Sequence, residues 1–237
     1  MKGSGSNSGT QLLAMHGWAG DHRAWKPWAL LAAARGWAFS CGERGYGQLP
    51  LQQPTWFNDS HCRVVIGHSM GPHLLPPELF SQASAVVLLA SFAAFVPPGL
   101  EGKGLRTALR GMSQRLESGE ATAMLRDFFR QAAAPHPVAA LPPGPLEQGL
   151  SPEGSQRLLQ DLRRLAEIST LPQGFPGDVP VLIVEANDDQ IVSAASRALL
   201  RQALPQATVW SLDQAGHCLL DPQLPDRVLG WIADVQA

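Results

Sequence analysis

Short apolar runs alternate with longer amphipathic segments along most of the chain. The short runs are continuously apolar, which is typical of parallel strands that are covered on both faces. We expect strands over residues 11–15, 37–41, 62–66, 85–90, 179–185 and 208–212. Helical patterns lie at residues 25–34, 71–79, 194–204 and 222–235. This alternation predicts βαβ units and an α/β fold with a mostly parallel sheet flanked by helices.

The last helix carries a clear start signal. Asp221 is placed to cap it, and Pro222 would occupy its first position, where the missing N–H of proline costs little. The apolar residues that follow share one face at helical spacing. They are Val228, Leu229, Trp231, Ile232 and Val235.

Residues 96–178 interrupt the alternation. Gly and Pro cluster at both ends of this segment, and helical patterns without strand-like runs lie between. Their apolar faces are Leu105, Leu109, Met112 and Leu116, then Leu158, Leu159, Leu162, Leu165 and Ile168. We predict a helical cap inserted into an α/β core of residues 11–95 and 179–237, after a flexible lead-in of residues 1–10. Ordinary crossover helices are the alternative.

Composition narrows the classes of function. The net charge is −2 and charged residues make up 16% of the chain, so no electrostatic case exists for a nucleic-acid partner. No apolar run reaches the roughly 18 residues of a membrane span. The opening MKGSGSNSGT lacks the apolar core of a secretory signal. Three widely spaced cysteines, Cys41, Cys62 and Cys218, favour reduced thiols. We expect a cytoplasmic protein without a metal site.

Ser69 stands in the sequence Gly67-His68-Ser69-Met70-Gly71, directly after an apolar run. The flanking glycines allow a tight strand-to-helix turn that would expose the serine hydroxyl at the end of the sheet. The motif alone is weak, because small residues also cluster in ordinary loops. Pro76 and Pro77 should end or kink the following helix near Leu75.

A serine nucleophile needs a base, and the base needs an orienting carboxylate. His217 lies between the last expected strand and the last helix, and Asp188 and Asp189 follow the preceding strand. The chain order Ser, Asp, His fits a serine mounted on a strand-turn-helix. We predict a catalytic triad of Ser69, His217 and one of the two aspartates. The other aspartate would cap its turn.

An oxyanion site is the remaining requirement for acyl transfer. The sequence Leu13-Ala14-Met15-His16-Gly17-Trp18 is typical of a strand that runs into a turn. We expect the backbone N–H groups of Trp18 and Met70 to be the oxyanion donors. The loss of one such donor typically costs about 10²–10³ in rate.

Five motifs together resemble the α/β-hydrolase superfamily. They are His16-Gly17-Trp18, Gly45-Tyr46-Gly47, the Ser69 motif, Asp189-Gln190-Ile191-Val192 and Gly216-His217. The resemblance covers nearly the whole chain outside the lead-in and the cap. It implies an α/β-hydrolase fold and a serine carboxylesterase without a cofactor, and its Asp-x-Ile-Val pattern selects Asp189 over Asp188. Pro72 departs from the pattern, since a small residue usually stands there.

Within the superfamily, the His-Gly-Trp turn, the small size and the helical cap are similar to the pimeloyl-acyl-carrier-protein methyl ester esterases of biotin synthesis. This resemblance implies an ester carried on acyl carrier protein. We expect Trp18 and Phe92 to line the acyl pocket, and Arg106 and Arg110 to contact the acidic carrier protein. Core packing of the aromatic residues and a mixed, solvated face for the arginines are the alternatives.

Three other functions fit the same residues. A general short-chain esterase and a hydrolase acting on C–C bonds would keep the triad and change the substrate. A non-catalytic, hydrolase-like binding protein belongs to a different class, and an intact triad argues against it.

Overall fold

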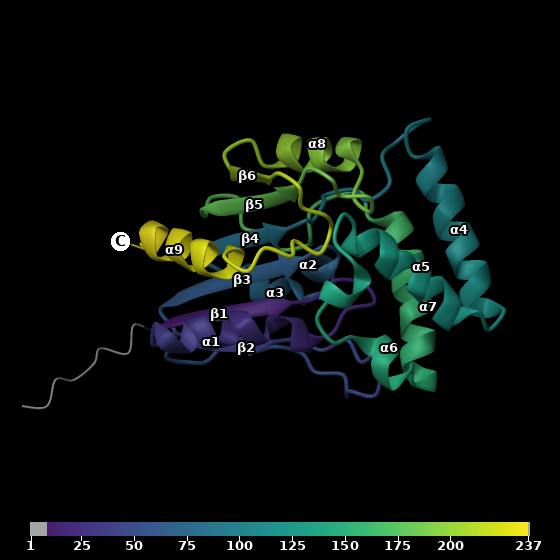
Figure 1. The fold of residues 1–237 in the computed structure, drawn as a ribbon. Helices are drawn as coiled ribbons and strands as arrows, with labels where there is room; N and C mark the ends of the chain where they lie inside the picture. The colour runs from purple at the N-terminus through teal and green to yellow at the C-terminus, as the bar shows by residue number, and fades with distance from the viewer. Residues whose placement is uncertain (1–8, 237) are drawn as a thin grey trace, which may run out of the picture.

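A computed structural model describes residues 9–236 and shows a six-stranded sheet in the order β2-β1-β3-β4-β5-β6 (Figure 1). Every neighbouring pair of strands is parallel. The strands are β1 (Thr10–Met15), β2 (Ala38–Cys41), β3 (Cys62–His68), β4 (Ala85–Leu89), β5 (Val181–Ala186) and β6 (Thr208–Leu212). The predicted parallel α/β sheet is confirmed. Of the lead-in predicted for residues 1–10, residues 1–8 lie outside the described part, and Thr10 already belongs to β1.

Helices cover both faces of the sheet and one of its ends (Figure 1). They are η1 (His22–Trp25), α1 (Lys26–Ala34), α2 (Gly71–Leu74), α3 (Pro77–Phe80), α4 (Lys103–Glu117), α5 (Ala121–Ala133), η2 (Val138–Ala140), α6 (Pro145–Gln148), α7 (Pro152–Glu167), α8 (Ala194–Ala203) and α9 (Leu224–Gln236). Among residues 9–236, no helix has both the length and the apolar character needed to cross a bilayer.

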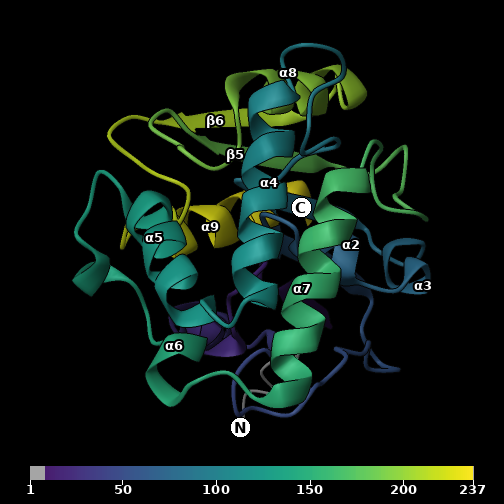
Figure 2. The same cartoon turned by 90° about the vertical axis from the view of Figure 1, so that its right-hand side faces the viewer.

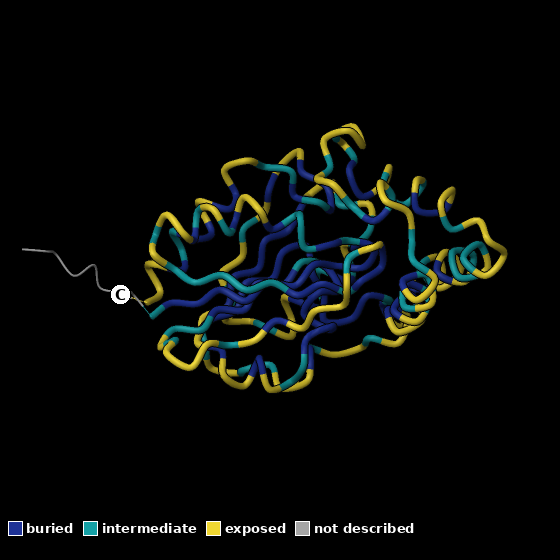
Figure 3. The backbone as a smooth tube through the Cα atoms, turned by 90° about the horizontal axis from the view of Figure 1, so that it is seen from below, coloured by how far each residue is buried: buried dark blue, intermediate teal, exposed yellow. Residues whose placement is uncertain are grey.

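The two faces of the sheet belong to two apolar clusters. Leu12 and Ala14 of β1 pack in the cluster that holds the inner faces of α1 and α9. Leu13 and Met15, which point the other way, pack in the cluster that holds α2, α3 and α8. Figure 3 shows the buried strands enclosed between more exposed layers. Burial on both faces explains why the strands are continuously apolar in sequence.

Helices α4 to α7 form the insertion between β4 and β5. They lie together at one end of the sheet, beyond the carboxyl ends of the strands (Figures 1 and 2). The apolar face predicted for α7 is buried at Leu158, Leu162 and Leu165, and Leu109 of α4 packs in the same cluster. The helical insertion is confirmed, whereas its limits as a domain, residues 96–178, stay a prediction.

An ionic network fixes α7 to the loop that follows β2. The guanidinium of Arg44 donates to both carboxylate oxygens of Asp161, at 2.6 and 2.7 Å. The hydroxyl of Tyr46 donates to the same carboxylate at 2.7 Å. Asp161 is 2% exposed, and its carboxylate raises the pKa of Arg44. Helix α7 approaches this loop so closely that a Cβ on Gly154 would lie 1.9 Å from the carbonyl oxygen of Tyr46.

The prolines after Ser69 divide the supporting helix as predicted. Helix α2 ends at Leu74, and Leu75 and Pro76 adopt extended backbone before α3 begins at Pro77. Pro72 lies in the first turn of α2, where no N–H is needed. The four-residue α2 therefore replaces the longer helix that the pattern over residues 71–79 favours.

Helix α9 starts later than the sequence predicts. The carboxylate of Asp221 accepts the N–H of Gln223 at 2.8 Å, and its backbone carbonyl accepts the N–H of Leu224 at 3.1 Å. These bonds hold residues 221–223 in a turn, so the helix begins at Leu224 rather than Pro222. Asp221 caps the start of the segment but not the first position of the helix.

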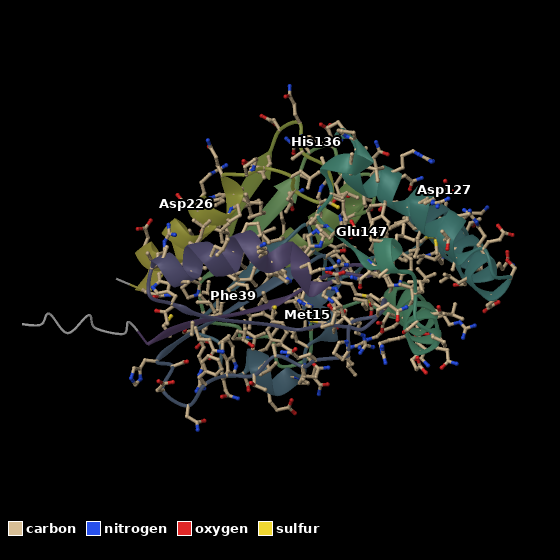
Figure 4. All side chains as sticks on the ribbon, turned by 60° about the horizontal axis from the view of Figure 1, so that its bottom comes forward. Met15, Phe39, Asp127, His136, Glu147 and Asp226 are labelled. Atoms are coloured by element: carbon tan, nitrogen blue, oxygen red, sulfur yellow. The ribbon has the colours of Figure 1, made fainter. Side chains whose placement is uncertain are left out.

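The Asp161 network leads to a prediction about stability. Replacing Asp161 with Ala should lower the free energy of unfolding by about 3 kcal/mol, because Arg44 and Tyr46 lose their buried acceptor. Asp127→Ala is the control, since Asp127 pairs with Arg115 and Arg130 on the outer side of α5 (Figure 4) and should change stability little. Urea unfolding of both variants measures the difference, and equal effects would contradict the prediction.

Candidate active site

Ser69 lies in a tight turn between β3 and α2. Its backbone is left-handed, with φ of 54°, which is uncommon for a residue other than glycine. Two bonds hold this conformation: the N–H of Ser69 donates to the carbonyl of Leu89 at 2.8 Å, and the hydroxyl of Ser91 donates to the carbonyl of Ser69 at 2.7 Å. The turn therefore fixes the serine at the carboxyl end of the sheet.

Two glycines make this turn possible because neighbouring groups come too close to them for any side chain. A Cβ on Gly71 would lie 2.2 Å from the carbonyl oxygen of Met15, at the end of β1. A Cβ on Gly67 would lie 2.3 Å from the ring of Pro72. Both distances are far below van der Waals contact. A side chain at position 71 would force the turn away from β1, and one at position 67 would displace the Pro72 ring at the start of α2.

The structure brings Ser69, His217 and Asp189 into one hydrogen-bonded chain. Ser69 Oγ lies 3.0 Å from His217 Nε2, and His217 Nδ1 lies 2.9 Å from Asp189 Oδ2. A carboxylate accepts, so Nδ1–H is the donor and the Nε2 of a neutral ring accepts the serine proton. This order of roles is the one a serine nucleophile requires.

Of the two aspartates, Asp189 contacts the histidine. Its Oδ1 accepts the N–H groups of Ile191 and Val192, at 2.7 and 2.9 Å. Burial by itself raises the pKa of Asp189, but the neighbouring His217 and these N–H groups outweigh burial, so the pKa is lowered. Asp188 is exposed, and within residues 9–236 its one hydrogen bond runs from its backbone N–H to the carbonyl of Ala215. The carboxylate beside His217 is thus held ionised.

The turn after β1 lies directly against Ser69. A Cβ on Gly17 would come within 2.8 Å of the Cβ of Ser69. Within residues 9–236, the N–H groups of Trp18 and Met70 donate no hydrogen bond. They are the two expected oxyanion donors. Trp18 lies in the turn after β1, and Met70 directly follows Ser69.

Glu43 supports this turn, and the sequence analysis did not single it out. Its carboxylate accepts the N–H of His22 at 2.9 Å and that of Gly45 at 2.7 Å, and it lies 3.6 Å from His16 Nε2. Burial raises the pKa of Glu43, but the interactions with His16 and these N–H groups outweigh it and lower the pKa to about 2. A glutamate two residues before the Gly-Tyr-Gly motif is the signal that could have found it.

A cavity of about 800 Å³ opens beside His217. It extends from the Gly17 turn between α5 and the start of α9, and the segment after α5 forms one wall (Figure 4 shows His136 and Glu147 there). Its walls are mainly apolar and include Trp18, Trp25, Trp28, Phe128, Phe129 and Leu219. Such a cavity suits a largely apolar ligand.

The predicted binding residues lie in different places. Trp18 borders the cavity, and its indole N–H donates to the carbonyl of Leu158 at 2.8 Å. Phe92 is 1% exposed, stacks on His73 and is not among the described residues that border the cavity, which favours core packing. Arg106 donates to the carbonyls of Pro97 and Gly99.

Arg110 also lies away from the cavity. It donates to the hydroxyl of Thr107 at 3.4 Å on α4. Elsewhere on the insertion the arginines alternate with acids, as in the pairs of Arg115 with Asp127 and of Arg163 with Glu117. The face is therefore mixed in charge.

Two histidines lie near Ser69 in the sequence, the partly buried His68 and the buried His73. His68 Nε2 lies 2.9 Å from the carbonyl oxygen of His217, and His73 Nε2 lies 2.9 Å from the carbonyl oxygen of Phe92. Burial lowers the pKa of each to about 4. Both rings are therefore neutral at pH 7, and Asp189 is the charged group in contact with His217.

The thiol next to His217 is poorly suited to reaction. Burial raises the pKa of Cys218 to about 12, so little thiolate forms at neutral pH. The described residues also contain no group of three or more His, Cys, Asp or Glu side chains arranged to hold a metal ion.

Comparison with solved structures identifies the fold. A bromoperoxidase from Bacillus anthracis matches with a TM-score of 0.69 at 16% identity, covering 95% of this chain and 92% of that chain. An esterase from Exiguobacterium antarcticum matches with a TM-score of 0.72 at 14% identity, covering 96% and 92%. A 2-hydroxy-6-oxo-6-phenylhexa-2,4-dienoate hydrolase from Rhodococcus sp. strain RHA1 matches with a TM-score of 0.67 at 18% identity, covering 97% of this chain and 92% of that chain.

These are proteins of the α/β-hydrolase fold, and this chain has that fold, as its sequence motifs predict. No protein-family model matches the chain, and no curated protein matches it in sequence. The fold is therefore shown, while the reaction has to be argued from the site.

The neutral histidines predict how stability depends on pH. The unfolded chain binds protons on His68 and His73 below their ordinary pKa of 6.5, whereas the folded chain does so only near pH 4. Their contribution is present above pH 6.5 and is lost as the pH falls toward 4.

His73→Gln should make the fall in unfolding free energy between pH 7 and pH 4.5 smaller by about 2 kcal/mol. Urea unfolding at both pH values measures it, with the wild-type protein as reference. An unchanged fall in the variant would show that His73 does not fold as a neutral ring.

Proposed function

We propose that the protein is a serine hydrolase that cleaves carboxylic esters, with Ser69 as its nucleophile. The observation that carries this proposal is the chain of hydrogen bonds from Ser69 Oγ through His217 to Asp189, placed beside a large apolar cavity. The left-handed turn at Ser69 supports it, because strained backbone at a functional residue persists only where the surrounding structure holds it.

In the first half of the reaction, Ser69 Oγ attacks the ester carbonyl carbon as His217 Nε2 takes the hydroxyl proton. The carboxylate of Asp189 stabilises the imidazolium, and the N–H groups of Trp18 and Met70 bind the oxyanion. When the tetrahedral intermediate collapses, Nε2–H protonates the leaving oxygen. The alcohol departs, and the acyl group remains on Ser69.

In the second half, a water molecule gives a proton to His217 Nε2 and attacks the acyl carbonyl. The oxyanion forms again in the same position. Collapse of this intermediate returns the proton to Ser69 Oγ and releases the carboxylic acid. No electron transfer and no cofactor are needed for either half.

The cavity supports a substrate with an extended apolar arm. Its volume of about 800 Å³ lies toward the upper end of the roughly 300–1,000 Å³ typical of small-molecule sites. Where ionised groups reach its rim they are paired, as in the contacts of Arg23 with Asp21 and Glu147. We infer that the arm in the cavity carries no charge.

At a finer level, we propose the methyl ester of a pimeloyl chain on acyl carrier protein as the substrate, in the cytoplasm. The motifs His16-Gly17-Trp18 and Gly67-His68-Ser69-Met70-Gly71 support it by resemblance. The basic side chains of Arg106 and Arg110 support carrier docking, because within residues 9–236 neither forms an ion pair. Acyl chains fit the apolar cavity.

Two substitutions test the triad. Ser69→Ala should abolish hydrolysis of p-nitrophenyl acyl esters, because no nucleophile remains. Asp189→Asn should lower kcat by about 10⁴, because the ring of His217 is no longer held in the tautomer that accepts the serine proton.

Asp188→Asn is the matched control and should retain activity near that of the wild type, since its carboxylate is exposed to solvent. Labelling of Ser69 by a fluorophosphonate separates an enzyme from a non-catalytic binding protein. Full activity in Ser69→Ala would refute the mechanism.

The finer substrate has its own test. Expression of the protein in a biotin-requiring strain that lacks its pimeloyl-ester esterase should restore growth, and expression of Ser69→Ala should not. Absence of growth with folded, expressed protein, together with p-nitrophenyl ester hydrolysis in vitro, would overturn the biotin assignment and leave the esterase proposal standing.

A further inference from the structure

His68 has a second relation to the proposed active site besides preceding Ser69 in the chain. Its Nε2–H donates to the backbone carbonyl of His217 at 2.9 Å. Its ring lies 5.0 Å from the ring of His217, centroid to centroid. His68 also borders the cavity, together with His217 and Gly17. One neutral side chain therefore joins the nucleophile turn to the loop that carries the base.

The loop that carries His217 needs such a connection. It contains left-handed backbone on both sides of the histidine, at Gln214 (φ of 54°) and Leu219 (φ of 46°), and neither residue is a glycine. Conformations of this kind persist only where other contacts hold them. On one side His217 borders the cavity, and its neighbour Cys218 donates its N–H to the carbonyl of Ala132 on α5.

We infer that His68 is a positioning residue: its hydrogen bond to the His217 carbonyl keeps the imidazole between Ser69 and Asp189. This inference rests on the proposed function. Misplacement of a reacting group by about 1 Å typically costs about 10²-fold in rate. The His68 bond joins the segment that carries the nucleophile to the loop that carries the base, so it is in a position to prevent that misplacement.

The role requires His68 to stay neutral. Its Nε2–H is engaged with a carbonyl, so a second proton would place a positive charge beside the imidazolium that forms on His217. The titratable groups that face His68 are His217, Asp189 and His16, and burial lowers the pKa of His68 to about 4. Above pH 5 it therefore carries no charge.

The chain contains a matched control for this bond. His73 is also a neutral histidine near Ser69, and its Nε2–H also donates to a backbone carbonyl at 2.9 Å, that of Phe92. Phe92 is a core residue, 1% exposed, and within residues 9–236 it forms no hydrogen bond with Ser69, His217 or Asp189. Loss of the His73 bond therefore measures the structural cost of removing such a histidine.

The test compares His68→Gln, His68→Asn and His73→Asn in the hydrolysis of p-nitrophenyl esters. A glutamine amide reaches about as far as Nε2 and can donate to the His217 carbonyl, whereas an asparagine amide is one methylene shorter. We expect kcat of His68→Asn to fall by about 10- to 100-fold with KM within about 2-fold of the wild type. His68→Gln should recover kcat to within about 3-fold, and His73→Asn should leave kcat unchanged.

A pH profile of kcat/KM completes the test. Its acid limb should keep the same midpoint in His68→Asn, because His68 is uncharged in that range. A displaced midpoint would mean that His68 acts as an acid or base and would overturn the positioning role. Equal kcat in wild type and His68→Asn, equal losses in His68→Asn and His68→Gln, or an equal loss in His73→Asn would overturn it too. Wild-type protein without activity or fluorophosphonate labelling would instead refute the proposed function.

Discussion

The approach of the Ser69 turn to the end of β1 is the constraint on which the rest of the site depends. Gly71 admits the carbonyl of Met15 at a distance that no side chain would tolerate. Because of this contact, the serine lies beside the turn that follows β1, where a Cβ on Gly17 would come within 2.8 Å of the Cβ of Ser69. Both expected oxyanion donors and the serine hydroxyl are thereby fixed to strands of one sheet rather than to mobile loops.

Around that contact, the carboxylates of Glu43, Asp161 and Asp189 each have several donors, and burial keeps His68 and His73 neutral at pH 7. Glu43 and Asp189 each accept backbone N–H groups, and Asp161 accepts from Arg44 and Tyr46. Donors of this kind offset the cost of removing a charge from water. Because His68 is neutral, it places no positive charge beside the imidazolium that Asp189 would stabilise.

Local patterns predicted much of this from sequence. The apolar runs gave the strands, and the serine, aspartate and histidine could be placed because each stands at the end of a predicted strand. Sequence order alone left Asp188 and Asp189 equivalent. The structure separates them through the N–H groups of Ile191 and Val192, which only the second carboxylate reaches. Turn geometry of that kind has no signature in composition or periodicity.

Ion pairs between residues far apart in the sequence could not be predicted, for a different reason. Arg44 and Asp161 are 117 residues apart, and neither residue type indicates a partner at that separation. Asp161 nevertheless occupies the apolar face of α7, three residues after Leu158 and four before Leu165. A charged residue at such a position implies a buried partner. The α9 boundary was missed because the hydrogen bonds of Asp221 hold residues 221–223 in a turn. For Phe92 the sequence left the acyl pocket and the core as alternatives, because tertiary packing decides between them.

The contacts that hold the helical insertion on the core differ in how directly they involve the loop of His217. Helix α7 is fixed through Asp161 to the loop after β2, and through the carbonyl of Leu158 to the indole of Trp18. Helix α5 instead meets the His217 loop directly: the N–H of Cys218 donates to the carbonyl of Ala132, and Gly216 approaches the carbonyl of Ala134 too closely for a side chain. Ala132 also borders the cavity. The wall that faces a substrate and the backbone that carries the proposed base are therefore one packed unit, so a ligand that displaces α5 would also displace His217.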